Sequence, residues 1–381
     1  MTARLRTLLA LAAALAALGA AGPVAHAATS RAAVHEAFQR IVSDPEGPPG
    51  IVAIVQRGAR AEVYRLGVAD VASGRRPAVR DHIRIASVSK AFNGAVALSL
   101  ASDRTLPLGT TIVAGLPGTL PRAGGVTVRQ ALQHVGGLPE YIRSEGFVRA
   151  LTADPTGYLA PRQLLGFVRD EPLDFPPGSR YRYSDTDNIV VGLMAARAAG
   201  RPYRRLLRDR VFRPLGLTAT SLPAQPPLPA PRLRGYEVAA GEPPEDVTTA
   251  LSPSGAWASG GIVSTPRDLS RFIRAYAGGR LFGTAARRAQ LRFRPGASSP
   301  PGPGANAAGL GIFRYRTSCG TVLGHTGSFP GYRIFAAATR DGRRSVVFAA
   351  NAQIVPGQGS EQVSDAIRAA QRLAVCRALG R

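Results

Sequence analysis

The sequence predicts an α+β fold: an antiparallel five-stranded sheet, flanked by terminal helices, with an inserted and mostly helical lobe. Runs rich in strand-forming residues lie near both ends of the chain, at residues 50–67 and 320–351. Between them, helical periodicity is broken repeatedly by Pro and Gly. One sheet built from both ends of the chain therefore encloses a helical insertion.

The N-terminal strands are expected at residues 50–56 and 61–67, joined by a hairpin at 57–60. Three more strands follow near the C-terminus, and Asp341-Gly342 turns the last pair. These three strands span residues 320–328, 331–339 and 345–351. Helices are predicted at 30–43 and 361–379, and surface loops at the Pro-rich stretches 222–231 and 295–303. The chain is then divided into an α/β lobe at 28–101 plus 306–381 and a mostly helical lobe at 102–305.

Residues 1–27 have the pattern of a secretory signal peptide. Arg4 and Arg6 precede an apolar run at 8–21, and Ala25-His26-Ala27 is a small-x-small cleavage pattern. The run is shorter than the roughly 20 residues of a membrane span, and no later segment is long enough. We therefore expect a secreted protein in the cell-wall space, without a membrane span.

Export makes the two cysteines, Cys319 and Cys376, candidates for a disulfide rather than for a metal or redox site. A bridge between them would stabilise the fold by roughly 4 kcal/mol in the chain-entropy model. The alternative is two buried free thiols.

The formal net charge of +24 favours polyanionic surroundings such as anionic cell-wall polymer. The densest arginine group, at residues 201–213, has the pattern of a solvated helix face, and no nucleic-acid-binding module is found. The five histidines show no metal spacing, and neither a Gly-rich phosphate loop nor a Gly-x-Ser-x-Gly elbow occurs. We expect no metal, no cofactor and no nucleic-acid partner.

Ser87 and Lys90 suggest an activated serine. If a helix begins near Ser87, residues three apart share a face, so the amine can reach the hydroxyl. The free N–H groups of the first turn would lie where an oxyanion develops. Lys90 is the one lysine beside 47 arginines, and only lysine can act as a neutral base. A chance surface lysine is the alternative.

Two further stretches join Ser87 and Lys90: Tyr183-Ser184-Asp185, and Gly324-His325-Thr326-Gly327 at the end of a predicted strand. Together they resemble the serine β-lactamase and penicillin-binding-protein superfamily. The similar branch contains class C β-lactamases, soluble secreted D-alanyl-D-alanine carboxypeptidases and related esterases. It carries Ser-x-x-Lys, Tyr-x-Asn and Lys-or-His-Thr-Gly in this order, and its carboxypeptidases pair cysteines in comparable places.

The resemblance implies a role for each matching residue. Ser87 would be the acylated nucleophile, Lys90 its base partner and Tyr183 the proton relay, with the backbone N–H groups of Ser87 and Ser328 as the oxyanion hole. The resemblance further implies that the substrate carboxylate binds to His325, Thr326, Gly327 and Ser328. It implies apolar walls formed by Trp257 and Phe147, and Arg314 is the candidate carboxylate-binding arginine.

Asp185 departs from the family, which has asparagine there. An aspartate keeps acceptors but loses the amide donor, and its charge favours the ammonium form of Lys90. Base work would then fall more heavily on Tyr183. His134 is assigned to structure rather than to catalysis.

We therefore expect a secreted, monomeric serine acyl-transfer hydrolase. The favoured activity is that of a D-alanyl-D-alanine carboxypeptidase, acting on peptidoglycan peptides through an acyl-enzyme on Ser87, with β-lactams as related substrates. A class C-like β-lactamase or an esterase would share this chemistry. A non-catalytic cell-wall or β-lactam-binding protein is the more remote alternative.

Overall fold

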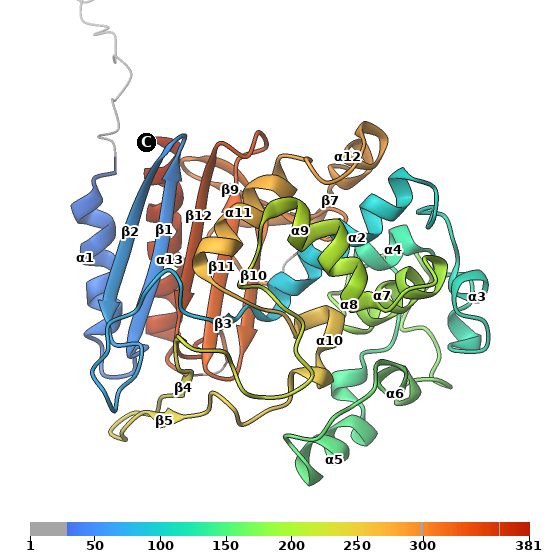
Figure 1. Cartoon of the computed structure of the whole chain (residues 1–381), viewed down its shortest axis with the longest axis horizontal. Coiled ribbons are helices and arrows are strands. Elements are labelled where there is room, and N and C mark those ends of the chain that lie inside the picture. Colours follow the sequence, from blue (N-terminus) through green and yellow to red (C-terminus); the bar gives the residue numbers. More distant parts are fainter. Residues whose placement is uncertain (1–28, 298–299, 358) are drawn as a thin grey trace, which may run out of the picture.

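The structure is a computed structural model that describes residues 29–297, 300–357 and 359–381 (Figure 1). The predicted signal peptide at residues 1–27 lies outside the described residues. Within the described ranges, no helix combines the length and apolar character needed to cross a membrane.

The main sheet has eight antiparallel strands among the described residues, so the prediction of five was too low. The five expected strands are present, and three more extend one edge. In spatial order the sheet consists of β2 (Arg60–Gly67), β1 (Gly50–Arg57), β12 (Arg344–Ala350), β11 (Tyr332–Ala338), β10 (Gly320–Phe329), β9 (Phe313–Thr317), β8 (Ala305–Ala308) and β7 (Arg294–Ala297).

Two of the three additional strands, β7 and β8, lack the sequence features of isolated strands. β7 and β8 have four residues each and contain Pro, Gly, Asn and Ala, which strands generally avoid. Pairing with β9 orders β8, and β8 in turn orders β7 through an irregular register. The expected loop at 295–303 therefore begins as strand. The lobe boundaries at 101–102 and 305–306 stay a prediction.

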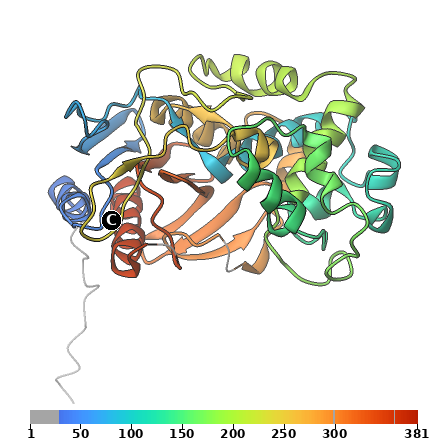
Figure 2. The same cartoon turned by 90° about the horizontal axis from the view of Figure 1, so that it is seen from below.

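Both faces of the sheet are covered, as Figure 2 shows from below. The predicted terminal helices are confirmed as α1 (Arg31–Val42) and α13 (Glu361–Leu379), which pack on one face. On β1, Ile51, Ala53 and Val55 point toward these helices, whereas the alternate residues join the core on the other face. Strands buried on both faces explain the nearly continuous apolar sequences.

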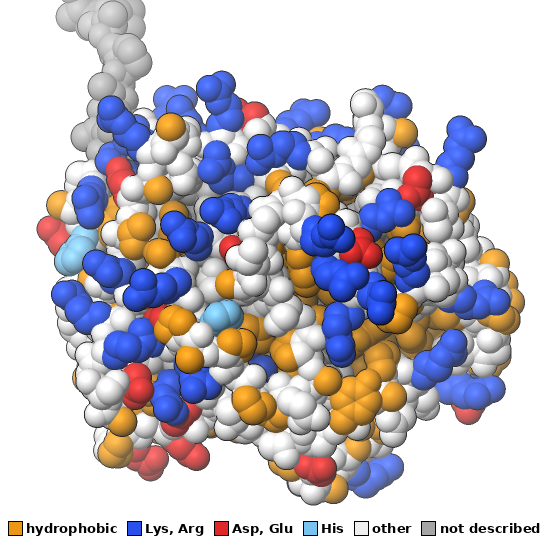
Figure 3. All heavy atoms as spheres, in the orientation of Figure 1, with side chains coloured by type: hydrophobic (Ala, Val, Ile, Leu, Met, Phe, Trp, Pro, Cys, Tyr) orange, Lys and Arg blue, Asp and Glu red, His pale blue; other side chains and the backbone are white. Residues whose placement is uncertain are grey.

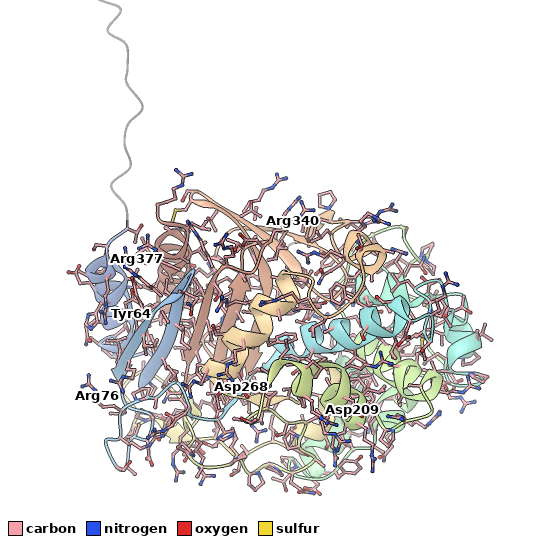
Figure 4. All side chains as sticks on the ribbon, turned by 45° about the horizontal axis from the view of Figure 1, so that its top comes forward. Tyr64, Arg76, Asp209, Asp268, Arg340 and Arg377 are labelled. Carbon is pink, nitrogen blue, oxygen red and sulfur yellow. A yellow bond between two sulfur atoms is a disulfide. The ribbon has the colours of Figure 1, made fainter. Side chains whose placement is uncertain are left out.

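The C-terminal helix is tied to the sheet at two points. Arg377 of α13 forms an ion pair with Glu62 of β2 at 2.5 Å, and the Tyr64 hydroxyl donates to the same carboxylate at 3.0 Å; Figure 4 labels Arg377 and Tyr64. Cys319 and Cys376 form a disulfide in the structure, with Cα atoms 5.1 Å apart. The bridge joins α13 to the residue before β10.

The other face of the sheet contacts α11 (Pro266–Ala277), and beyond it lie the helices that build the site (Figure 1). α2 (Ser89–Ser102) is buried from Ser89 to Leu100 and packs against α7 (Thr186–Ala198) and α10 (Trp257–Gly260). The remaining elements are β3 (Ile83–Arg84) paired with β6 (Val263–Ser264), β4 (Tyr236–Glu237) paired with β5 (Glu245–Asp246), α3 (Ile112–Gly115), α4 (Val128–Leu132), α5 (Glu145–Ala153), α6 (Pro161–Gly166), α8 (Tyr203–Leu207), α9 (Arg213–Leu215), α12 (Thr284–Gln290), and the turns η1 (Ala86–Val88), η2 (Pro121–Ala123), η3 (Tyr141–Arg143), η4 (Arg208–Phe212) and η5 (Pro253–Gly255).

Candidate active site

Ser87 lies in the 3₁₀ turn η1, directly before α2. The preceding residue, Ala86, has φ of 49°, a left-handed conformation that is uncommon for a side chain with Cβ. Such strain persists only where the surroundings impose it, and it is frequent at active sites. The turn presents Ser87 to a cavity while Lys90, one turn later, is fully buried.

The Lys90 amine contacts three acceptors. Its Nζ lies 3.2 Å from Ser87 Oγ, 2.6 Å from Asp185 Oδ1 and 2.9 Å from the Ser259 carbonyl oxygen. An ammonium has three N–H donors, so each acceptor receives one. The predicted approach of the lysine to the serine is present, and Asp185 points toward Lys90.

Tyr183 brings its ring 4.8 Å from Lys90 Nζ, and its buried hydroxyl has no hydrogen-bond partner of normal geometry among the described residues. Burial, and then the charge of Asp185, raise the pKa of Tyr183 well above 10, against a smaller opposing effect of the Ser87 hydroxyl. Tyr183 is therefore a neutral phenol in the free site. The expectation that Tyr183 takes over base work is not supported.

Glu140 belongs to the site, although sequence reasoning missed it. Its Oε2 accepts the backbone N–H of Asp185 at 2.6 Å. The neighbouring Tyr141 donates its N–H to Thr186 Oγ1 at 3.0 Å, and that hydroxyl donates to the Pro139 carbonyl at 2.7 Å. Burial, and then the Asp185 charge, raise the pKa of Glu140 to about 7. The segment thus holds the start of α7, and with it Asp185.

His134 and Asp187 form a second buried pair behind Tyr183. His134 Nδ1 accepts the Ser184 N–H at 3.2 Å and lies 3.3 Å from Asp187 Oδ2. Burial lowers the pKa of His134 and raises the pKa of Asp187, so it disfavours the charged form of both side chains. The His134 ring lies 4.6 Å from the Tyr183 ring. This placement agrees with a structural role.

The last residues of β10 run beside the Ser87 turn. Gly327 is required there, because a Cβ would lie 2.4 Å from the Ile85 carbonyl oxygen. Ser328 lines the cavity together with Ser87, while Thr326 is buried. His325 Nδ1 donates to the Thr326 carbonyl at 2.5 Å, and burial lowers its pKa to about 3. His325 was expected to bind the substrate carboxylate, and a neutral imidazole cannot attract a carboxylate by charge.

The cavity at Ser87 has a volume of about 180 Å³. Phe147 lies in its wall, as predicted, next to Tyr141. Asp185 is the one charged side chain among the described lining residues. Polar residues in the lining are Ser87, Asp185, Ser252 and Ser328, and the larger apolar ones are Tyr141, Ile142, Phe147, Leu151 and Phe329.

Two predicted contacts lie elsewhere. Trp257 packs over Gly192, where an added Cβ would approach the Trp257 ring to 2.8 Å. The centre of the Trp257 ring lies 4.8 Å from that of Tyr203, and the two rings are tilted. The Arg314 guanidinium lies 4.9 Å from the Phe293 ring centre. Neither residue lines the cavity at Ser87. Strand alternation explains Arg314, because Phe313 and Tyr315 take the buried positions beside it.

No group of three or more His, Cys, Asp or Glu side chains in the described part of the chain is arranged to hold a metal ion.

Comparison with known proteins matches residues 38–370 to the Beta-lactamase family. The structure is similar to a D-stereospecific amidohydrolase from Streptomyces sp., with 30% identity, TM-score 0.75, and coverage of 88% of this chain and 97% of that one. D-amino acid amidase from Ochrobactrum anthropi SV3 has 26% identity, TM-score 0.75, and coverage of 89% and 98%.

Among curated relatives, D-alanyl-D-alanine-carboxypeptidase/endopeptidase AmpH of Escherichia coli (strain K12) is 27% identical over 238 residues. That match covers 60% of this chain and 58% of AmpH. A putative D-alanyl-D-alanine carboxypeptidase of the same strain is 30% identical over 104 residues, 27% of this chain and 23% of that protein. The matches thus span less than two thirds of these curated relatives.

Proposed function

Since the chain belongs to the Beta-lactamase family and is a serine hydrolase, we propose that it cleaves amide bonds of small D-amino-acid derivatives through an acyl-enzyme on Ser87. The observation that carries this choice is the charge of the cavity. Asp185 is its one charged lining residue in the described structure; of the residues expected to bind a substrate carboxylate, His325 is neutral and Arg314 does not line the cavity.

A carboxylate in the lining favours a substrate with a free amino group over one with a free carboxylate. The apolar walls at Phe147 and Phe329 suit an apolar side chain, and a cavity of about 180 Å³ suits an acyl part of one residue. The likeness to the D-stereospecific amidohydrolase and to the D-amino acid amidase supports this substrate class.

The contacts of Lys90 define the first proton transfer. A neutral amine has two donors and one lone pair. If the donors point to Asp185 and to the Ser259 carbonyl, the lone pair faces Ser87 Oγ at 3.2 Å. Ser87 attacks the substrate carbonyl carbon and gives its proton to Lys90. The ammonium so formed has three satisfied donors, and the Asp185 charge stabilises it.

Tyr183 supplies the second transfer. As a neutral phenol with an unpartnered hydroxyl, it can donate to the leaving nitrogen as the tetrahedral intermediate collapses, and Lys90 can restore that proton. Ser87 and Ser328 line the same cavity, and their backbone N–H groups are proposed to hold the oxyanion. Water then cleaves the ester, with Lys90 as the base again.

The D-alanyl-D-alanine carboxypeptidase predicted from sequence is the second candidate. It is favoured by the β10 edge at Thr326–Ser328 beside Ser87 and by the likeness to AmpH. A β-lactamase or an esterase differs from it only in deacylation rate or in the need for a carboxylate. Secretion into the cell-wall space and a monomeric state are likewise proposed.

The test compares three substrates on the mature protein: D-phenylalanine amide, its L-enantiomer, and N-acetyl-D-alanyl-D-alanine. We expect release of ammonia from the D-amide, with kcat/KM above the values for the other two. Ser87→Ala controls for contaminating hydrolases. Preferred release of D-alanine from the acylated dipeptide would replace the amidase by the carboxypeptidase. If Ser87 supports no turnover of any of the three substrates, and mass spectrometry detects no penicillin adduct, the proposal that the protein is a serine hydrolase is refuted.

A further inference from the structure

A groove outside the catalytic cavity combines an apolar floor with an arginine rim. It consists of two adjoining hollows of about 880 and 400 Å³, which share Arg204, Arg205 and the segment 222–224. We call it the arginine groove. Figure 3 shows Lys and Arg side chains gathered over hydrophobic atoms where Figure 1 places α8 and α9.

The floor of the arginine groove is made by apolar side chains that are almost completely buried. Phe212, Leu217 and Leu222 line it with 7%, 3% and 5% exposure. The arginine cluster was expected to be a solvated helix face, which would be convex. A hollow of this volume beneath it is instead in the range of binding sites for small molecules.

The rim carries more positive charge than its surroundings neutralise. Asp209, labelled in Figure 4, pairs with several of these arginines. Its carboxylate oxygens lie 3.1 Å from a guanidinium nitrogen of Arg208, 3.7 Å from one of Arg201 and 3.9 Å from one of Arg213. Arg204 and Arg205 are exposed and have no ion-pair partner in the described part of the chain. Two guanidinium groups therefore stand free above an apolar floor.

The helix geometry aligns this rim. Residues Arg208–Phe212 form a π-helical turn between α8 and α9, with i→i+5 bonding. This wider turn brings Arg213, five residues after Arg208, to the same side, and both reach Asp209. Arg204 lies one ordinary turn before Arg208. The rim is therefore a row of guanidinium groups along one side of the hollow.

We propose that the arginine groove binds a single molecule of an anionic amphiphile: an alkyl or acyl chain with a carboxylate or phosphate head. The head would pair with Arg204 and Arg205, since guanidinium matches both oxyanions in a bidentate manner. The chain would lie on Phe212, Leu217 and Leu222, and its end would reach Tyr203 and Trp257 in the smaller hollow. Charge complementarity and the apolar floor select this ligand class over a simple anion or a neutral lipid.

The site adjoins the catalytic machinery without being part of it. Trp257 begins α10, whose Ser259 carbonyl accepts from Lys90. Ser254 lines the smaller hollow, while the next residue, Gly255, lines the cavity at Ser87. A bound chain would therefore touch the turn that supports Lys90, although the proposal does not depend on the substrate of Ser87.

The test is calorimetric titration with dodecyl phosphate below its micelle concentration, beside dodecanol and inorganic phosphate. We expect saturable binding of dodecyl phosphate, about tenfold or more tighter than either control. R204Q/R205Q should lose about tenfold in affinity, whereas R76Q/R340Q, which removes two exposed arginines elsewhere (labelled in Figure 4), should not. Ala224→Trp, which places a bulky ring at a residue that lines both hollows, should also weaken binding.

Equal affinity in R204Q/R205Q would overturn the proposal, as would equally tight inorganic phosphate. If the protein binds vesicles of anionic phospholipid but not the monomeric amphiphile, the proposed ligand site is wrong and the arginines form a membrane-binding surface instead. Thermal unfolding of each variant verifies that it is folded, and the ligand series on the unmodified protein keeps the test decisive if a variant fails to fold.

Discussion

Replacement of Glu140 by Gln tests the electrostatics of the site through stability, independently of any substrate. The pKa of Glu140 is about 7 in the folded protein, against 4.5 ordinarily, because of burial first and the Asp185 charge second. The unfolded chain therefore releases this proton near pH 4.5, and the folded chain near pH 7. Between these values the folded state binds more protons, so the free energy of unfolding falls as pH rises.

The gap between 4.5 and about 7 corresponds to at most about 3 kcal/mol. Glutamine stays neutral and its carbonyl can still accept the Asp185 N–H, so Glu140→Gln should escape this loss. The free energy of unfolding of the variant minus that of the wild type should rise by about 3 kcal/mol between pH 4 and pH 8. Burial, the largest cause of the raised pKa of Asp187, acts in both proteins and cancels in the difference, whereas the smaller effect of the Glu140 charge on Asp187 is removed with Glu140.

Urea unfolding at pH 4, 6 and 8 measures this difference. Glu145→Gln is the matched control, because Glu145 is 91% exposed and should show no pH-dependent difference. A constant difference for Glu140→Gln, or one that falls toward alkaline pH, would refute the assignment of a largely neutral Glu140 and with it the electrostatic account of the site.

Three further predictions concern the catalytic groups and the disulfide. Lys90→Arg should fold but lose acylation by about 10²- to 10⁴-fold, since guanidinium keeps its proton; wild-type adduct formation with penicillin would contradict this. Asp185→Asn should move the pH optimum of acylation downward by about one unit, because the charge that favours the ammonium is removed; an unchanged pH–rate profile would exclude the role. Reduction of Cys319–Cys376 should lower the melting temperature by roughly 5 °C or more, and two alkylatable thiols in the unreduced protein would exclude the bridge.

Motifs with fixed spacing predicted well which candidate site residues lie together. The three-residue interval between Ser87 and Lys90 sets their approach within one helical turn, so local geometry alone predicts the contact. The same holds for Gly327, where the His-Thr-Gly pattern places a glycine against the Ser87 turn. The central strands were also predictable, because their runs of apolar residues are too long to lie exposed to water in a loop.

Contacts across long sequence intervals were not predictable in this way. Arg314 faces Phe293 because neighbouring residues of β9 take the buried positions, and this choice depends on the pairing of a strand that the sequence did not reveal. Trp257 turns away from Ser87 because Gly192 of α7 leaves room for its ring. Both outcomes follow from tertiary packing, which overrides any pattern within a short window.

Glu140 shows how this limit affects function. It lies 45 residues from Asp185, and no motif links the two, yet its carboxylate accepts the Asp185 N–H. The first-turn N–H of Asp187 is accepted by Ser184 Oγ at 3.3 Å, so the Asp185 side chain is not needed as a helix cap and is free to pair with Lys90. An aspartate in place of the family's asparagine is therefore more than a lost amide donor. Together with Glu140 it places two carboxyls at the site, and because the pKa of Glu140 is raised to about 7, the charge that Glu140 carries depends on pH near neutrality.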